Sequence, residues 1–171
     1  ALVIIGLIIY SAIQAYYAIA GNFESKSSYH PHTKPVILGI LICIFIEIII
    51  GTEIRGGLDM SRKENPLIEG VILLKMLGPF KYMHTILGFT LLGLTIYLWK
   101  IVNDIKFISS SFMVNSVNFI MGLIITQIIL GEALVFLEVK PLMQLFHMWF
   151  SSLLVGLSVA SFTFYKISME K

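Results

Sequence analysis

The sequence predicts an all-α protein, a polytopic bundle of transmembrane helices. Its 171 residues are 57% hydrophobic and only 13% charged, and its mean hydropathy is +0.91. The apolar residues fall into long runs with few charges, which is the pattern of helices that cross a bilayer. A water-soluble domain of this size is not expected to be so apolar. We therefore predict an integral membrane protein.

Charge and cysteine content exclude several classes of protein. The net charge is +2 and there is no basic run, so the sequence does not indicate a nucleic-acid partner. The single cysteine, Cys43, excludes an internal disulfide and a cysteine zinc site, and its apolar surroundings suggest a packing role.

Five apolar stretches qualify as spans. Each is about 20 residues long, which is the length that a helix needs to cross the hydrocarbon core. They are 1–20, 35–54, 82–103, 113–136 and 143–166. The first begins at Ala1 and has no charged region before it, so we interpret it as a span rather than a signal peptide. The missing methionine suggests a fragment.

The second and fourth spans carry related endings, Glu47-Ile-Ile-Ile-Gly51 and Gln127-Ile-Ile-Leu-Gly131. A loop follows each of them, and then a span that opens with histidine. The chain thus contains a tandem two-helix repeat, which predicts a site where the two copies meet. The first loop also holds stretch 67–80, which we predict to be an amphipathic interfacial helix that ends near Gly78-Pro79.

The third and fifth spans open with His84 and His147 in one pattern: histidine, six residues, leucine, any residue, glycine, leucine. An ionisable side chain inside an apolar helix is costly and marks a candidate functional site. Both lie a few residues inside the same face, so they are expected to meet if the two spans are neighbours. Such an imidazole pair most readily binds an iron porphyrin. The alternative is a pair of interfacial or hydrogen-bonded histidines.

Small residues accompany the pair. Gly88 and Ser151 lie four residues after each histidine, on its own helix face, and are predicted to leave room for a flat macrocycle. Gly93 and Gly156 lie nine residues after, on the opposite face, where they favour close helix packing.

Other polar residues near the predicted pair have two interpretations each. Arg55 is a candidate clamp for a haem propionate or else an interfacial arginine, and the adjacent Gly56-Gly57 is predicted to allow a sharp turn. Glu47 and Gln127 either orient a histidine ring through its second nitrogen or bond each other.

Two more histidines, His30 and His32, lie in a polar loop on the opposite face. They are predicted to be surface residues too far away to join the pair, although a His-x-His sequence is also a weak metal-binding signal.

The topology predicts two sides but does not orient them. Lysine and arginine divide evenly, six and six, if Lys100 is counted on the side opposite the histidine pair, so the positive-inside rule alone does not decide. The basic residues on the histidine side fall mostly in a long loop, among acidic residues, where the rule is weaker. We therefore expect the pair near the outer face of a bacterial cytoplasmic membrane. The inner side then holds loops 21–34 and 104–112, and the outer side holds loops 55–81 and 137–142.

Three segments, "EIIIGTEIRGGLD", "KYMHTILGF" and "QIILGEALVFLEVKPLMQLFHMWFSSLLVG", are similar to the haem A synthase family of cytochrome oxidase assembly proteins. The resemblance covers roughly residues 36–166 and is strongest to the C-terminal half of that eight-helix family. It implies that residues 1–34 are the last helix of a preceding half with an inner loop, and that 35–171 form a four-helix haem-binding domain.

The resemblance also implies a cofactor and an activity. His84 and His147 would be the bis-histidine ligands of a haem b, and the family oxidises a methyl group of haem O to the formyl group of haem A. The family's motif runs here from Glu47 to Arg55, with Glu47 in place of the usual glutamine. The family's substrate site lies in the other half, so the sequence assigns no catalytic residue.

The implied partners are membrane lipid, haem O, haem O synthase or oxidase assembly factors, and a second copy in a homo-oligomer. Three alternatives stay open. In the first, the chain is a compact four-helix form whose one site serves catalysis. In the second it is a non-catalytic b-type cytochrome, and in the third it is a transporter or assembly scaffold with an incidental histidine pair.

Overall fold

The computed structural model describes residues 2–20, 28–68, 72–73, 75, 77–104, 106–107, 109–137 and 140–169. The elements of this described part are all helices, as the sequence predicts. They are α1 (Leu2–Ala20), α2 (Thr33–Glu64), α4 (Phe80–Val102), α5 (Ser111–Phe136) and α6 (Pro141–Met169).

Four of the described helices, α2, α4, α5 and α6, are long and apolar enough to cross a membrane. In α1 the side chains are described over Val3–Tyr16, an apolar stretch shorter than a full span. All five predicted spans are therefore helical, and four meet the length and composition of a span.

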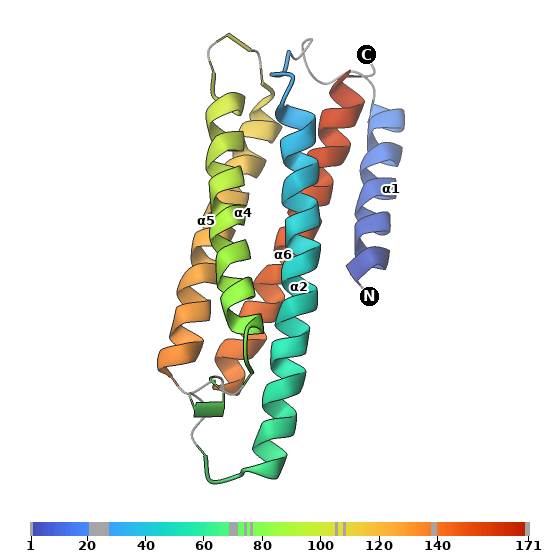
Figure 1. Ribbon diagram of the computed structural model, residues 1–171. Helices are drawn as coiled ribbons and strands as arrows, with labels where there is room; N and C mark the ends of the chain where they lie inside the picture. The colour runs from blue at the N-terminus through green and yellow to red at the C-terminus, as the bar shows by residue number, and fades with distance from the viewer. Residues whose placement is uncertain are drawn as a thin grey trace.

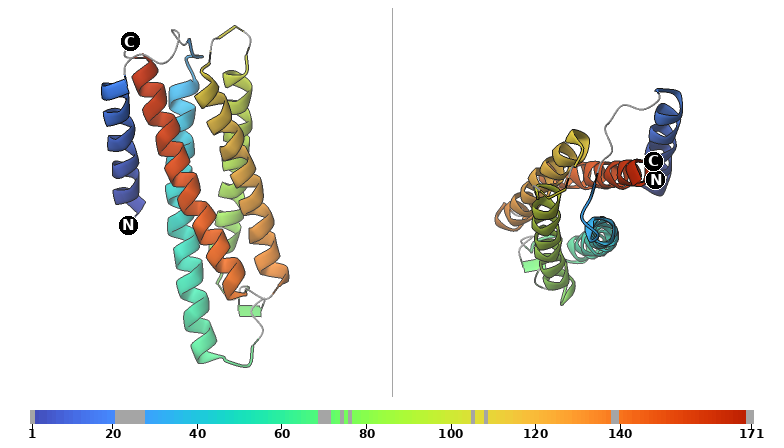
Figure 2. Two further views of the ribbon diagram at one scale, coloured as in Figure 1. Left: turned by 180° about the vertical axis from the view of Figure 1, so that it is seen from behind. Right: turned by 90° about the horizontal axis from the view of Figure 1, so that it is seen from above.

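Helices α2, α4, α5 and α6 form a four-helix bundle, and α1 lies on its outside (Figure 1). Helix α2 packs against α4, α4 against α5, α5 against α6, and α6 against α2. This closed order, visible from above in Figure 2, places α4 and α6 at opposite corners. Helix α1 packs on α6.

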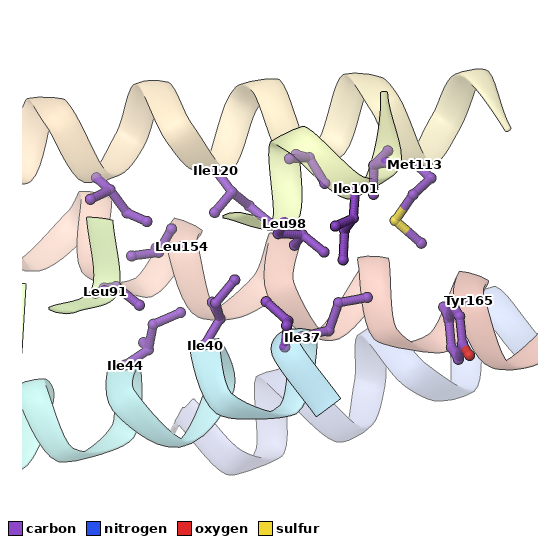
Figure 3. Close-up of a cluster of buried hydrophobic side chains, with 14 of the residues drawn as sticks. Ile37, Ile40, Ile44, Leu91, Leu98, Ile101, Met113, Ile120, Leu154 and Tyr165 are labelled. Atoms are coloured by element: carbon purple, nitrogen blue, oxygen red, sulfur yellow. The ribbon is translucent and has the colours of Figure 1, made fainter. Parts of the chain in front are cut away.

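Branched aliphatic side chains from all four helices fill the interior of the bundle (Figure 3). They recur three or four residues apart, so each helix turns one stripe inward. Cys43 is partly buried against this core, as its apolar surroundings predict. The deeply buried members include Ile37, Ile40, Ile44, Leu91, Leu98, Met113, Val117, Ile120, Ile124 and Val155.

The helix ends follow local rules of the chain. Ser110 precedes α5 and accepts a hydrogen bond from the backbone N–H of Met113 at 3.1 Å, which satisfies one of the unpaired donors of the first turn. Gly78 has φ of 65° and turns the chain into α4, with Pro79 as the residue before the helix. That conformation strains any residue with a Cβ.

Helix α2 is longer than predicted and continues ten residues beyond the predicted end at 54. The expected sharp turn at Gly56-Gly57 is wrong, because both glycines lie within the helix and the positive φ among described glycines falls at Gly78. Helix-favouring residues follow them, and the helix ends only at Glu64, because Asn65 is the residue before a proline and leaves the helical conformation.

Gly57 has a packing role instead. A Cβ on this residue would clash with Cδ2 of Leu77, so the glycine lets the segment before α4 approach α2. Leu73 and Leu58 are buried there in a second apolar cluster with partly buried Ile54, Ile68, Leu77 and Leu134. Of the predicted interfacial helix, Ile72, Leu73 and Lys75 are helical, and residues 69–71, 74 and 76 lie outside the described residues.

The contact between α1 and α6 depends on Gly156. A Cβ on Gly156 would lie 3.1 Å from Cδ1 of Ile9, whereas no described atom lies within 4 Å of one on Gly93, its counterpart in the repeat. Gly156→Leu is therefore expected to push α1 away from α6 and to cost about 1–3 kcal/mol, as overpacking does. Thermal unfolding in detergent measures this cost. Gly93→Leu is the matched control. An equal loss of stability in both variants would contradict the role of Gly156 in the contact between α1 and α6.

Candidate functional site

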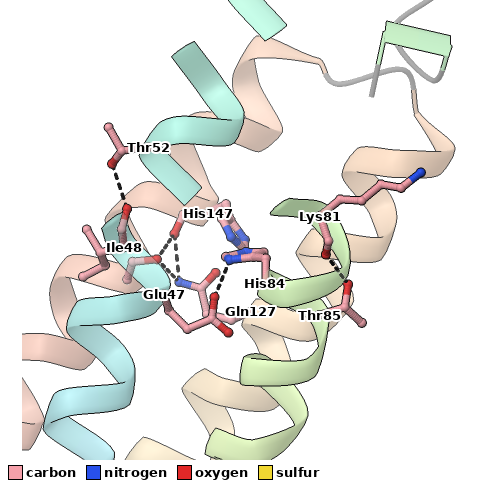
Figure 4. A network of polar contacts seen from close by, with 9 residues as sticks. Glu47, Ile48, Thr52, Lys81, His84, Thr85, Gln127 and His147 are labelled. Carbon is pink, nitrogen blue, oxygen red and sulfur yellow. Dashed lines mark hydrogen bonds and ion pairs between the residues drawn. The ribbon is translucent and has the colours of Figure 1, made fainter. Parts of the chain in front are cut away.

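His84 of α4 and His147 of α6 come together inside one end of the bundle (Figure 4). Their ring centroids lie 6.3 Å apart and the ring planes make an angle of 61°. The sequence placed both at one depth and predicted that they meet if their helices are neighbours. The helices instead occupy opposite corners, so the imidazoles meet across the bundle axis.

Glu47 of α2 supports the first ring of the pair. Its Oε2 atom contacts Nδ1 of His84, and the carboxyl-bearing side chain is only 12% exposed. A carboxylate buried in a membrane bundle needs such a partner, because its desolvation is costly. A hydrogen on Nδ1 that points at Glu47 leaves the lone pair of the neutral ring on Nε2 of His84. Of the two interpretations of Glu47, the structure supports the one in which it orients a histidine.

Gln127 of α5 supports the second half of the site in a different way. Its Nε2 atom donates to the backbone carbonyl of His147 at 2.8 Å and to Oγ of Ser151 at 2.7 Å. The Ser151 hydroxyl in turn donates to the same carbonyl at 2.9 Å. Gln127 thus fixes the backbone that carries His147.

Gly51 and Gly131 lie one turn after Glu47 and Gln127 and face the two rings. A Cβ on Gly51 would lie 3.5 Å from Cε1 of His84, and one on Gly131 would lie 3.8 Å from Cε1 of His147. Both glycines belong to the repeat in the sequence, which did not predict a role for them. Their spacing, four residues after the polar residue on the same helix face, was the signal that would have found them.

The small residues of the histidine helices accommodate these polar partners. A Cβ on Gly88 would lie 3.5 Å from Oε1 of Glu47, and Ser151 bonds Gln127. The space predicted beside Gly88 and Ser151 thus lies next to the side chains of Glu47 and Gln127. The prediction that a macrocycle occupies this space stays a prediction.

Arg55 lies on α2, two turns after Glu47, and reaches across to α6. Its Nη1 atom lies 2.6 Å from Sδ of Met148, the residue after His147. The guanidinium is exposed and therefore available to an anionic group at this end of the bundle.

His30 and His32 lie at the other end of the bundle and do not join the pair. Nδ1 of His32 is 2.7 Å from the hydroxyl of Tyr97, and Nδ1 of His30 accepts the backbone N–H of His32. Tyr97 follows His84 by 13 residues of α4, so about 20 Å of helix separates the two places. The prediction that these histidines are too far away is confirmed.

The donor set limits what the site can hold. Within the described residues there is no group of three or more histidine, cysteine, aspartate or glutamate side chains placed to bind one metal ion. Two facing imidazoles suit a metal that brings its other ligands with it, as the iron of a porphyrin does.

A family model described as cytochrome oxidase assembly protein matches residues 1–159. The match includes α1, which precedes the three segments that resemble the haem A synthase family, and it includes both histidines of the pair. No curated protein and no solved structure was found to match the chain.

Proposed function

Because the chain belongs to the family of cytochrome oxidase assembly proteins, which includes the haem A synthases, we propose that it serves in the conversion of haem O to haem A. In this proposal the four-helix bundle holds a haem b between His84 and His147. The observation that carries it is the distance of 6.3 Å between the two ring centroids.

This distance would suit two imidazoles that hold one metal ion between them. With metal–nitrogen bonds of about 2 Å and ring centroids about 1 Å beyond each nitrogen, two imidazoles on one metal stand about 6 Å apart. The contact of Glu47 with Nδ1 of His84 supports the same assignment, because it directs Nε2 toward a ligand. Gly51 and Gly131 keep the space beside both rings free of side chains.

A haem bound here would supply an electron-transfer centre for the oxidation of the haem O methyl group to a formyl group. The residues of this chain then have separate tasks. His84 and His147 hold the group, Glu47 and Gln127 orient the two histidines, and Arg55 is placed to bind a propionate. No residue is assigned to the oxidation itself.

The proposal extends to location and supply. The protein is an integral membrane protein, and we place it in a bacterial cytoplasmic membrane with the pair near the outer face. Haem O reaches it from haem O synthase through the lipid or by direct contact.

Two measurements test the proposal. The full chain purified in detergent is expected to show the spectrum of a six-coordinate low-spin haem b. Haem extracts of cells that contain haem O, but no other haem A synthase, are expected to contain haem A when the gene is expressed. Bound haem without haem A would favour a non-catalytic b-type cytochrome. A protein that binds no haem would overturn the proposal and leave an assembly scaffold.

A further inference from the structure

The two halves of the repeat hold their histidines in unlike surroundings (Figure 4). Glu47 and Gln127 are equivalent in sequence, but Glu47 contacts Nδ1 of His84 while Gln127 binds the backbone of His147. Nδ1 of His147 is buried and has neither a hydrogen-bond partner nor an ion-pair partner among the residues that the structure describes. One imidazole therefore has a carboxyl oxygen in contact with its second nitrogen, and the other has no such partner among the described residues.

We propose that Glu47 makes His84 the stronger electron donor of the pair and thereby lowers the reduction potential of the iron that the pair holds. The inference rests on the proposed function, because it needs a haem bound by His84 and His147. It assigns Glu47 as a positioning residue that acts through His84.

The physical reason lies in the hydrogen on Nδ1. A carboxylate that accepts this hydrogen fixes the ring tautomer and raises the basicity of Nε2, so the ring donates more strongly to a metal. Stronger donation and a nearby negative charge both favour the oxidised iron, which lowers the potential. Glu47 is 12% exposed, so water screens its charge little.

A purely structural role for Glu47 has a different signature. Its carboxylate lies close to the α4 backbone at Gly88, and loss of this packing would lower stability without moving the potential. The repeat itself supplies the substitution that separates the two roles. Glutamine has the shape of glutamate, is uncharged and already occupies the equivalent position as Gln127.

The experiment compares the wild-type chain with Glu47→Gln and with the control Glu53→Gln, a charge removal at an exposed position of the same helix. Each full-length protein is purified in detergent, its haem content and low-spin spectrum are recorded, and its potential is measured by redox titration. Glu47→Gln is expected to keep the haem and to raise the reduced-to-oxidised ratio about tenfold at a fixed potential, which corresponds to ~59 mV for one electron. Glu53→Gln is expected to leave the ratio unchanged.

The outcomes separate this inference from the proposed function. A wild-type chain without haem overturns both. Haem bound by Glu47→Gln at an unchanged potential overturns the inference alone, and so does a folded Glu47→Gln protein that binds no haem, because Glu47 would then hold the iron site together rather than make its ligands unequal.

If Glu47→Gln does not fold, the single-histidine variants give the same test. His147→Ala keeps the ligand that contacts Glu47, and His84→Ala keeps the other. The inference expects the lower potential in His147→Ala, and equal potentials or the reverse order would overturn it.

Discussion

Replacement of His84 and His147 together by alanine is expected to abolish haem binding by this protein. The two rings lie 6.3 Å apart across the bundle axis, and within the described residues no third histidine lies beside them. Loss of an outer partner of a metal ligand typically costs 10–100-fold in affinity, so loss of both ligands is expected to cost more than about a hundredfold. The haem-to-protein ratio of the purified chain and its low-spin spectrum measure the effect.

The chain supplies its own control for this experiment. His30 and His32 form the other histidine cluster, with ring centroids 4.8 Å apart at the opposite end of the bundle. Their joint replacement by alanine removes the same chemical groups and is expected to leave the haem content unchanged. Haem retained by the His84→Ala, His147→Ala double variant would exclude the pair as ligands.

The second large effect is expected from the two glycines that face the rings. Leucine at Gly51 and at Gly131 would fill the space next to Cε1 of His84 and of His147, where a Cβ alone already stands at 3.5 and 3.8 Å. The imidazoles would have to leave their positions, and the arrangement that would let both hold one metal ion would be lost. We expect the double variant to lose about 10–100-fold in haem affinity, as when a ligand loses its orientation.

Two comparisons make this prediction specific. Alanine at the same two positions makes only ordinary van der Waals contacts with the rings and is expected to preserve haem binding. Gly56→Leu lies on α2 near Gly51, with no described atom within 4 Å of its Cβ, and is expected to be neutral. Haem titration of each variant, together with its helical circular dichroism, separates a local effect from unfolding. If the double leucine variant binds haem with normal affinity, the small residues at these two positions are not needed for haem binding.

Much of the fold followed from the sequence because the bilayer imposes simple rules on length and composition. Five apolar stretches predicted five helices, and the structure has them at Leu2–Ala20, Thr33–Glu64, Phe80–Val102, Ser111–Phe136 and Pro141–Met169. The largest error lay at the end of α2. Hydropathy marks where an apolar run ends, but helix propensity and the proline after Asn65 decide where the helix ends.

The sequence predicted which residues belong to the site more fully than it predicted their contacts. The repeat singled out His84 and His147 and left two roles open for Glu47 and Gln127. The structure gives these two residues different partners, a ring nitrogen for one and a backbone carbonyl for the other. Their equivalent positions in the repeat predicted equivalent roles. Their chemistry differs, because a carboxylate can only accept hydrogen bonds whereas an amide nitrogen donates them.

By itself the sequence determined that this protein is a helical membrane bundle with two equivalent histidines near one face. That conclusion depends on the cost of placing each residue type in lipid, which is a property of the residue and its neighbours along the chain. Only the tertiary structure decided that α4 and α6 stand at opposite corners and that the rings meet across the axis at 6.3 Å. Helix order around a bundle is set by packing between distant segments, and periodicity within one segment carries no record of it.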